Sequence, residues 1–188
     1  MKKSLLLTFL FILFNTLLIS DFLDTLSIDQ AKRVNKFITS LRKRTPKNIL
    51  LRRKIFSEKE INSYINLIYI RRYTPEVKYL KLKFKDYNYV EGKAKIILKG
   101  KKYKNVPQFL KDIEVEFEGN IECDKYRMRF IHKKIKINGT DFTPEILDEA
   151  FSASQRNRKI KKSIFDWFRL FPGIKLIKTE PEKVIIFY

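Results

Sequence analysis

Cysteine and histidine each occur only once in this 188-residue chain, and methionine occurs twice. The lone Cys123 excludes an internal disulfide, so packing alone must hold a folded domain together. The lone His132 excludes the two or three imidazoles of a typical zinc site. Because no carboxylate pair occurs at helical spacing on an apolar face, we expect no metal, no cofactor and no enzymatic activity.

Glycine and acidic residues are also scarce. Gly100 and Gly139 stand isolated among only five glycines, which excludes a glycine-rich loop that cradles phosphate. The 21 acidic residues are outnumbered by 41 basic ones, for a formal net charge of +20. Such a charge attracts polyanions, including anionic lipid headgroups, envelope polymers and surface glycans. An AT-rich genome would produce the same lysine excess without any functional cause.

The first twenty residues have the layout of a secretory leader. Lys2 and Lys3 precede an apolar run over residues 5–19 that only three polar residues interrupt. This pattern predicts a signal peptide or short membrane anchor in residues 1–20. Ser20 suits a cleavage site but Leu18 is larger than usual two positions earlier, so cleavage and retention both stay open.

The remaining residues, 21–188, have the length of one domain with a core of its own. We expect a single exported domain that works outside the cytoplasm, either periplasmic or secreted, and anchored if the leader stays uncleaved. Removing Lys2 and Lys3 leaves 39 basic residues against 21 acidic ones, a formal charge of +18. The oligomeric state is left open by the sequence.

Apolar residues spaced three and four apart predict amphipathic helices near residues 28–43 and 58–71, and a third near 144–155. The start of the second helix carries the clearest local signal. Ser57 and Glu60 have the spacing of a capping box, which predicts that the helix begins at Glu58. Phe56 and Ile61 occupy the two positions of a hydrophobic staple around the same helix start.

Strict alternation of apolar and charged residues replaces helical spacing between residues 80 and 130. It predicts four consecutive strands that pair as a meander, with a bulge where Phe130 and Ile131 stand side by side. Two short strands, at 174–177 and 184–187, close the chain. The predicted fold class is α+β: a curved, mainly antiparallel sheet of about five to seven strands with helices packed on one face.

Sequential pairing would also bring opposite charges together on the wet face of that sheet. A row of glutamates on the third strand would lie between lysines on one side and arginines on the other. The residues concerned are Glu114, Glu116, Glu118 and Glu122, flanked by Lys93 and Lys95 and by Arg127 and Arg129. This arrangement favours a neutralised surface over a charge-driven binding site.

Basic and aromatic residues are interleaved over residues 156–171. Lysines reach headgroup phosphates while aromatic rings favour the boundary between water and acyl chains, so this segment is our predicted membrane contact. Its chosen residues are Lys159, Lys161, Lys162, Trp167 and Phe168. The alternative is that its apolar side closes the open end of the sheet. Stacking on nucleic acid would need a partner rarely met outside the cell, so we expect none.

Several stretches of the chain resemble a known group of proteins. They are FSEKEINSYI (56–65), YLKLKF (79–84), IEVEFEGNI (113–121), IKINGTDFTPEIL (135–147) and FPGIKLIKTEPEKVIIFY (171–188). Together they resemble poorly characterised secreted or anchored bacterial envelope proteins, which are similar to the tubular lipid-binding group. The resemblance implies a long helix lying in a strongly curved antiparallel sheet, an apolar cleft for acyl chains and no catalytic residue.

The sequence therefore predicts a non-enzymatic envelope protein that binds a lipid or other amphiphile and contacts an anionic membrane surface. The predicted lining of the lipid site is Phe84, Ile96, Phe117, Phe130 and Phe151, with ordinary core packing as the alternative role of each. The rival function is an envelope scaffold or interaction protein with a dry core, whose basic outer face recognises a protein or an anionic polymer. An internal cavity would distinguish the two.

Overall fold

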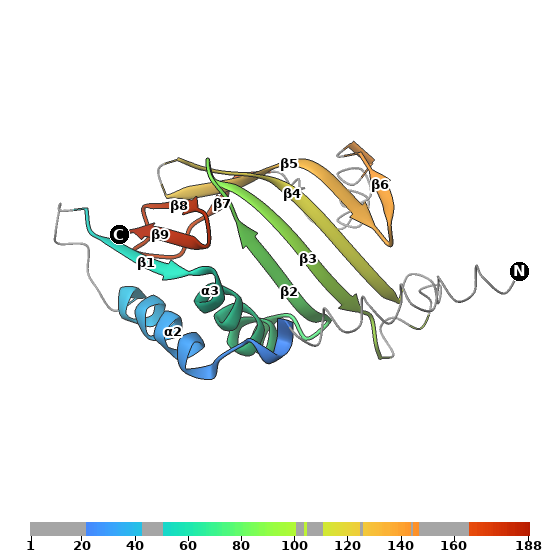
Figure 1. Cartoon of the computed structure of the whole chain (residues 1–188), viewed down its shortest axis with the longest axis horizontal. Helices are drawn as coiled ribbons and strands as arrows, with labels where there is room; N and C mark the ends of the chain where they lie inside the picture. Colours follow the sequence, from blue (N-terminus) through green and yellow to red (C-terminus); the bar gives the residue numbers. More distant parts are fainter. Residues whose placement is uncertain are drawn as a thin grey trace, which may run out of the picture.

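The computed structural model describes residues 22–42, 51–100, 104, 111–124, 126–143, 145–146 and 166–188. They form an α+β fold with two mainly antiparallel sheets, which confirms the predicted class (Figure 1). The larger sheet has the strand order β2-β3-β4-β5-β6, with β7 paired to β5. The smaller sheet has the order β1-β9-β8.

The larger sheet is the predicted meander. Its strands are β2 (Val77–Phe84), β3 (Tyr89–Ile97), β4 (Asp112–Asp124), β5 (Arg127–Ile137), β6 (Thr140–Phe142) and the short β7 (Phe168–Arg169). Tyr87 and Asn88 take positive φ in the β2–β3 turn, and Asn138 and Gly139 do so in the β5–β6 turn. Two successive residues with positive φ match the twist of a two-residue hairpin.

The smaller sheet joins two distant parts of the chain. β1 (Arg53–Ser57) pairs with β9 (Lys183–Phe187), which also pairs with β8 (Leu176–Glu180). The two closing strands were predicted, although the turn between them is shorter than expected. Nothing in the local sequence of β1 indicates that it would pair with a strand near the C-terminus.

The helices are α2 (Ile28–Arg42), α3 (Glu58–Tyr64), the π-helical segment η1 (Ile65–Tyr69) and α4 (Ile70–Tyr73). α2 and the continuous run from α3 to α4 match the first two predicted helices closely. In Figure 1, α2 and α3 lie side by side next to β1 and β2. Of the third predicted helix the structure describes Glu145 and Ile146, which are helical, and its other residues lie outside the described ranges.

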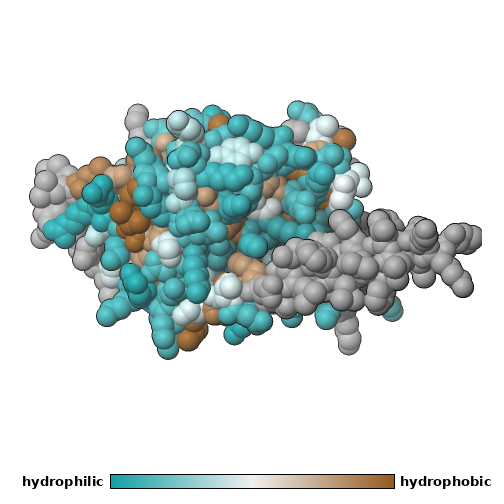
Figure 2. Space-filling view, viewed as in Figure 1, coloured by the Kyte–Doolittle hydropathy of each residue, from teal (hydrophilic) through white to brown (hydrophobic). Residues whose placement is uncertain are grey.

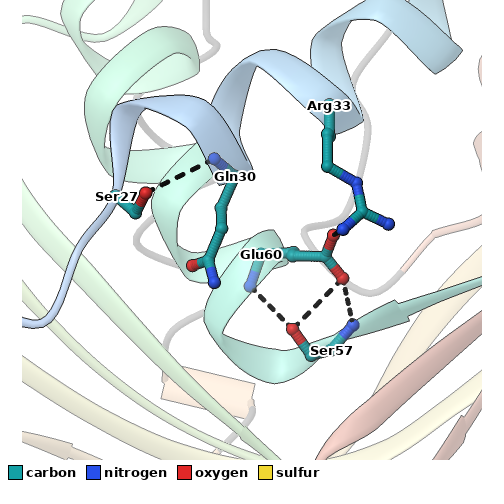
Figure 3. A network of polar contacts seen from close by, with 5 residues as sticks. All are labelled: Ser27, Gln30, Arg33, Ser57 and Glu60. Carbon is teal, nitrogen blue, oxygen red and sulfur yellow. Dashed lines mark hydrogen bonds and ion pairs between the residues drawn. The ribbon is translucent and has the colours of Figure 1, made fainter.

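A polar network fixes the start of α3 and joins it to α2 (Figure 3). The Ser57 Oγ accepts a hydrogen bond from the Glu60 backbone N–H at 3.2 Å, and the Glu60 carboxylate accepts one from the Ser57 N–H at 2.8 Å. This is the predicted capping box. The other oxygen of Glu60 pairs with the Arg33 guanidinium of α2 at 3.1 Å. Ser27, just before α2, donates its N–H to the Ser63 Oγ at 3.1 Å.

One side of α3 and η1 lies along the open edge of β2. The Asn62 amide donates to the Leu82 carbonyl and accepts from the Leu82 N–H, both at 2.8 Å. Asn66 makes the same pair of bonds with Leu80, at 2.7 and 2.8 Å. Four helical residues rise about 6 Å and two strand residues about 6.7 Å, so the spacings nearly match. The helix therefore supplies the hydrogen bonds that a further strand would make.

The hydrogen bonds of Asn62 and Asn66 form a side-chain ladder along β2, and Glu58, one helical turn before Asn62, extends it. Its carboxylate accepts a hydrogen bond from the Phe84 N–H at 2.8 Å. Burial raises the pKa of Glu58 above its ordinary value, more than the bond from Phe84 lowers it. Glu58 thus holds the end of β2 with a carboxyl group that the fold partly removes from water.

The main hydrophobic core lies where the helices, the smaller sheet and the apolar face of the larger sheet meet. Both staple residues belong to it: Phe56 is almost fully buried, and Ile61 packs against the buried cluster. Its buried members are Val34, Leu41, Phe56, Phe84, Val90, Leu170, Ile174, Val184 and Ile186. The C-terminal strands therefore complete a core that the helices and β2–β3 begin.

The bulge in β5 is present, but at Lys133 rather than at Phe130 and Ile131. Gly119 pairs with His132 and Glu118 with Lys134, so Lys133 has no partner across the strand. Ile131 consequently lies on the polar face of the sheet, where it is 42% exposed. The prediction misplaced the change of face because two adjacent apolar residues mark it only approximately.

The backbone of β5 approaches β4 closely at Gly119. A Cβ atom at this position would lie 2.2 Å from the Ile131 carbonyl oxygen and 2.7 Å from the His132 Cα. Both neighbours are backbone atoms, so no side-chain rotation would make room. The glycine thus permits the bulge beside it.

Opposite charges do meet on the polar face, with one change from the predicted pairing. Lys93 contacts Glu114 and Glu116 at 2.6 and 3.1 Å, and Lys95 contacts Asp112 at 3.2 Å. On the other side, the register places Lys136 opposite Glu116 and Lys134 opposite Glu118. The predicted arginines lie further along, where Arg129 contacts Glu122 at 2.6 Å and Arg127 contacts Asp124 at 3.5 Å. Hydrophilic side chains dominate the face seen in Figure 2.

Candidate functional site: an apolar pocket with a basic rim

One cavity among the described residues has a volume of about 790 Å³ and opens to solvent. It lies where η1 and α4 face the start of β2 and the end of β3. Small-molecule sites commonly occupy about 300–1,000 Å³, so this pocket has the size of one. Its lining residues are Leu23, Leu26, Asn66, Leu67, Ile70, Arg71, Pro75, Glu76, Val77, Lys78, Ile97 and Lys99.

The helical wall of the pocket follows from residue spacing. Leu67, Ile70 and Arg71 stand three and four positions apart, so they share one face of the η1–α4 segment. Asn66, at the edge of the same wall, is fixed by its bonds to β2. Hydrogen bonds therefore attach this wall to the edge of the sheet.

The opposite wall is apolar where the strands supply it. Val77 pairs with Ile96 across β2 and β3, and Ile97 follows at the end of β3. Leu23 and Leu26, from the stretch that precedes α2, add two further apolar side chains. The pocket thus offers hydrocarbon contact from three separate parts of the chain.

Basic side chains mark the pocket's rim. Arg71, Lys78 and Lys99 are exposed, whereas Glu76 is the one carboxylate among the pocket's described lining residues. The pairing of β2 with β3 shifts register between Val77 and Tyr79, which makes Lys78 the extra residue of a bulge. An apolar interior beside an excess of positive charge suits a ligand with a hydrocarbon part and an anionic head.

Exposed aromatic rings lie on the same η1–α4 segment. Tyr69 and Tyr73 are 45% and 52% exposed, and their ring centres are 5.1 Å apart. The Arg72 guanidinium lies 5.4 Å from the centre of the Tyr73 ring. Tyr69, Arg72 and Tyr73 thus form an exposed aromatic and basic surface on this segment.

The predicted lining residues do not line this pocket. Phe84 is buried in the main core, and Phe117 contacts Phe130 edge to face at 5.5 Å between ring centres. Ile96 lies next to Ile97, which does line the pocket. Phe151 lies outside the described residues. Sequence reasoning missed Leu67 and Ile70 because the pocket forms only where their helical segment meets strand ends that are distant in the sequence.

The predicted membrane contacts are only partly described. Lys159, Lys161 and Lys162 lie outside the described residues. Trp167 is half-buried, with the guanidinium groups of Arg127 and Arg129 at 5.4 and 4.8 Å from its ring. Phe168 is 48% exposed in β7, which pairs with the start of β5. Trp167 is thus held by cations of the sheet, while Phe168 presents its ring to solvent.

Cys123 and His132, the one cysteine and the one histidine of the chain, both lie in the larger sheet. Burial raises the pKa of the half-buried Cys123 thiol, which keeps it in the less reactive protonated form. His132 lies at the bulge of β5, opposite Gly119. The described residues contain no group of three or more side chains placed to bind a metal ion.

Two further findings bear on identity. None of the helices within the described ranges is long and apolar enough to cross a bilayer. Comparison of the chain with family models, curated proteins and solved structures gave no match.

Proposed function

We propose that this chain is a non-enzymatic, extracytoplasmic envelope protein that binds a lipid or other amphiphile and contacts an anionic membrane surface. The pocket beside η1 and α4 carries this proposal. Its apolar walls suit an acyl chain, and the basic rim suits a phosphate or carboxylate head. The leader-like first twenty residues support a site of action outside the cytoplasm.

Binding of oleate and of uncharged oleyl alcohol tests the pocket. The double variant Arg71→Gln/Lys99→Gln removes two cations from the rim and should weaken oleate binding about tenfold, equivalent to about 1.4 kcal/mol, with little effect on oleyl alcohol. Leu67→Gln places an amide in the apolar wall and should weaken both ligands. Lys32→Gln/Lys36→Gln, on the exposed side of α2, is the control of equal charge. Absence of oleate binding by the wild-type protein would refute the pocket's assignment.

The membrane contact is proposed at the opposite end of the larger sheet. The pocket lies near the Asp112 end of β4, whereas β7 lies near the Asp124 end, and a strand of this length spans about 40 Å. Phe168 and Tyr126 are exposed there beside Arg127 and Arg169. Contact through this end would leave the pocket free to face away from the membrane.

Flotation with liposomes tests this contact. Wild-type protein should float with vesicles that contain anionic phosphatidylglycerol and much less with neutral vesicles. Trp167→Ala/Phe168→Ala should reduce the floated fraction several-fold, because it removes the aromatic contact with the bilayer interface. Equal flotation of the variant and wild type would exclude these residues as the contact. A protein that binds neither oleate nor vesicles would favour the scaffold function instead.

A further inference from the structure

A second hollow crosses the polar face of the larger sheet, away from the amphiphile pocket. It has a volume of about 330 Å³ and spans β2, β3, β4 and β5. Gly92 and Phe117, which pair across β3 and β4, form its floor. Its other lining residues are Lys81, Lys83, Glu91, Lys93, Glu116, Glu118, Lys134 and Lys136. We call this hollow the lysine groove.

Two pairs of lysines form the sides of the lysine groove. Lys81 and Lys83 project from β2, and Lys134 and Lys136 project from β5. Three strand spacings separate β2 from β5, so the two sides stand about 14 Å apart at the backbone. Lysine side chains are long enough to close on a small ligand between them.

The glutamates in the lysine groove are already engaged by other groups. Glu91 pairs with Lys85, and Glu116 pairs with Lys93. The Glu118 carboxylate accepts a hydrogen bond from the Tyr89 hydroxyl at 2.8 Å, and this bond raises the pKa of Tyr89. Two of the three glutamates are therefore paired with lysines other than the four side lysines, whereas Glu118 keeps its negative charge because the Tyr89 hydroxyl is neutral.

The four side lysines keep their charge available for a ligand. Each has a carboxylate or a lysine directly across the sheet, but none forms an ion pair with another described residue. Lys81 stands opposite Lys93, a like-charge pair that costs stability unless an anion lies nearby. The Lys81 ammonium instead lies 5.2 Å from the Phe22 ring. This surplus positive charge is what sets the lysine groove apart from a neutralised sheet face.

We propose that the lysine groove binds a compact soluble polyanion with two or more phosphate or sulfate groups. A single phosphate would reach one side only, whereas a ligand with several anionic groups would contact β2 and β5 together. The site is separate from the amphiphile pocket and does not depend on it. Charge pairing was expected to argue against a binding site on this face of the sheet. Lys134 and Lys136 do stand opposite Glu118 and Glu116 in the register, but they form no ion pair with them, so their charge remains available.

Titration with sodium tripolyphosphate by calorimetry at 50 mM NaCl tests the proposal, with orthophosphate and with vesicles containing phosphatidic acid as separate arms. The double variant Lys83→Gln/Lys134→Gln removes one cation from each side. It should weaken tripolyphosphate binding at least tenfold. The control Lys32→Gln/Lys36→Gln loses the same charge from α2 and should change the affinity less than twofold. All replaced lysines are exposed, so melting curves should stay unchanged.

NMR spectra test where tripolyphosphate binds. The backbone amide signals of Gly92 and Phe117 should shift on addition of tripolyphosphate but much less with orthophosphate. Equal weakening in the two variants would mean binding to net charge alone and would overturn the proposal. So would binding to vesicles without binding to tripolyphosphate, or no binding at all. Oleate binding by Lys83→Gln/Lys134→Gln should stay normal, so the outcome for the lysine groove can be read apart from that for the pocket.

Discussion

At the scale of single residues, Ser57 shows how one hydroxyl organises a helix start. Replacing it with alanine removes the acceptor for the Glu60 N–H, and we expect a loss of about 1 kcal/mol in the free energy of unfolding. Urea denaturation of Ser57→Ala measures this loss. Ser40→Ala is the control, since Ser40 donates only to a carbonyl within α2, and it should stay within about 0.5 kcal/mol of wild type.

Glu58 gives a prediction that depends on pH. Its pKa is raised in the folded state, so the folded protein holds the proton more tightly than the unfolded chain does. The free energy of unfolding should therefore fall as the pH rises from below 4.5, the ordinary pKa of a glutamate side chain, through the raised pKa of Glu58.

Glu58→Gln keeps an oxygen acceptor for the Phe84 N–H but carries no charge. The variant and wild type should unfold at similar urea concentrations at pH 4, and the variant should be the more stable at pH 7. A variant that is less stable at pH 7 would show that the carboxylate's attraction to the Phe84 N–H outweighs the cost of its burial.

At the scale of elements, the hydrogen bonds between the helix and β2 depend on both the donor and the acceptor of each asparagine side-chain amide. Asn62→Asp keeps the acceptor for the Leu82 N–H but loses the donor to the Leu82 carbonyl and places a charge in a buried site. We expect the free energy of unfolding to fall by at least about 2 kcal/mol. Hydrogen exchange at the Leu82 amide should also be faster in Asn62→Asp than in wild type.

Asn35→Asp, on α2, is the matched control because its side chain makes none of the described bonds to the sheet. It should leave both stability and exchange at Leu82 nearly unchanged. A similar loss in both variants would mean that the added charge, rather than the broken ladder, causes the effect.

The helices and strands differ in how well the sequence alone predicted them. Local signals predicted α2, the capped start at Glu58 and the strands of the meander, because each depends on neighbours a few residues away. The pairing of β1 with β9, the ladder from Asn62 and the pocket wall at Leu67 depend on contacts between distant segments. An asparagine on a helix face reads as solvent-exposed until the edge strand beside it is known.

At the scale of the whole molecule, the net charge of +20 should oppose compaction. Raising NaCl from 20 to 300 mM should screen this repulsion and increase the melting temperature by a few degrees, because the Debye length falls below the spacing of most surface charges. Differential scanning calorimetry at constant pH measures the change. A lower melting temperature at high salt would show that the ion pairs of the sheet outweigh the overall repulsion.

The side-chain ladder along β2 also has a consequence for self-association. A sheet usually recruits a foreign chain through the unpaired amides of an outer strand, which is how fibrils and swapped dimers grow. Here the amides of Leu80, Leu82 and Phe84 are already occupied by a helix. Polymerisation by strand addition is therefore blocked along this flank, however concentrated the protein becomes.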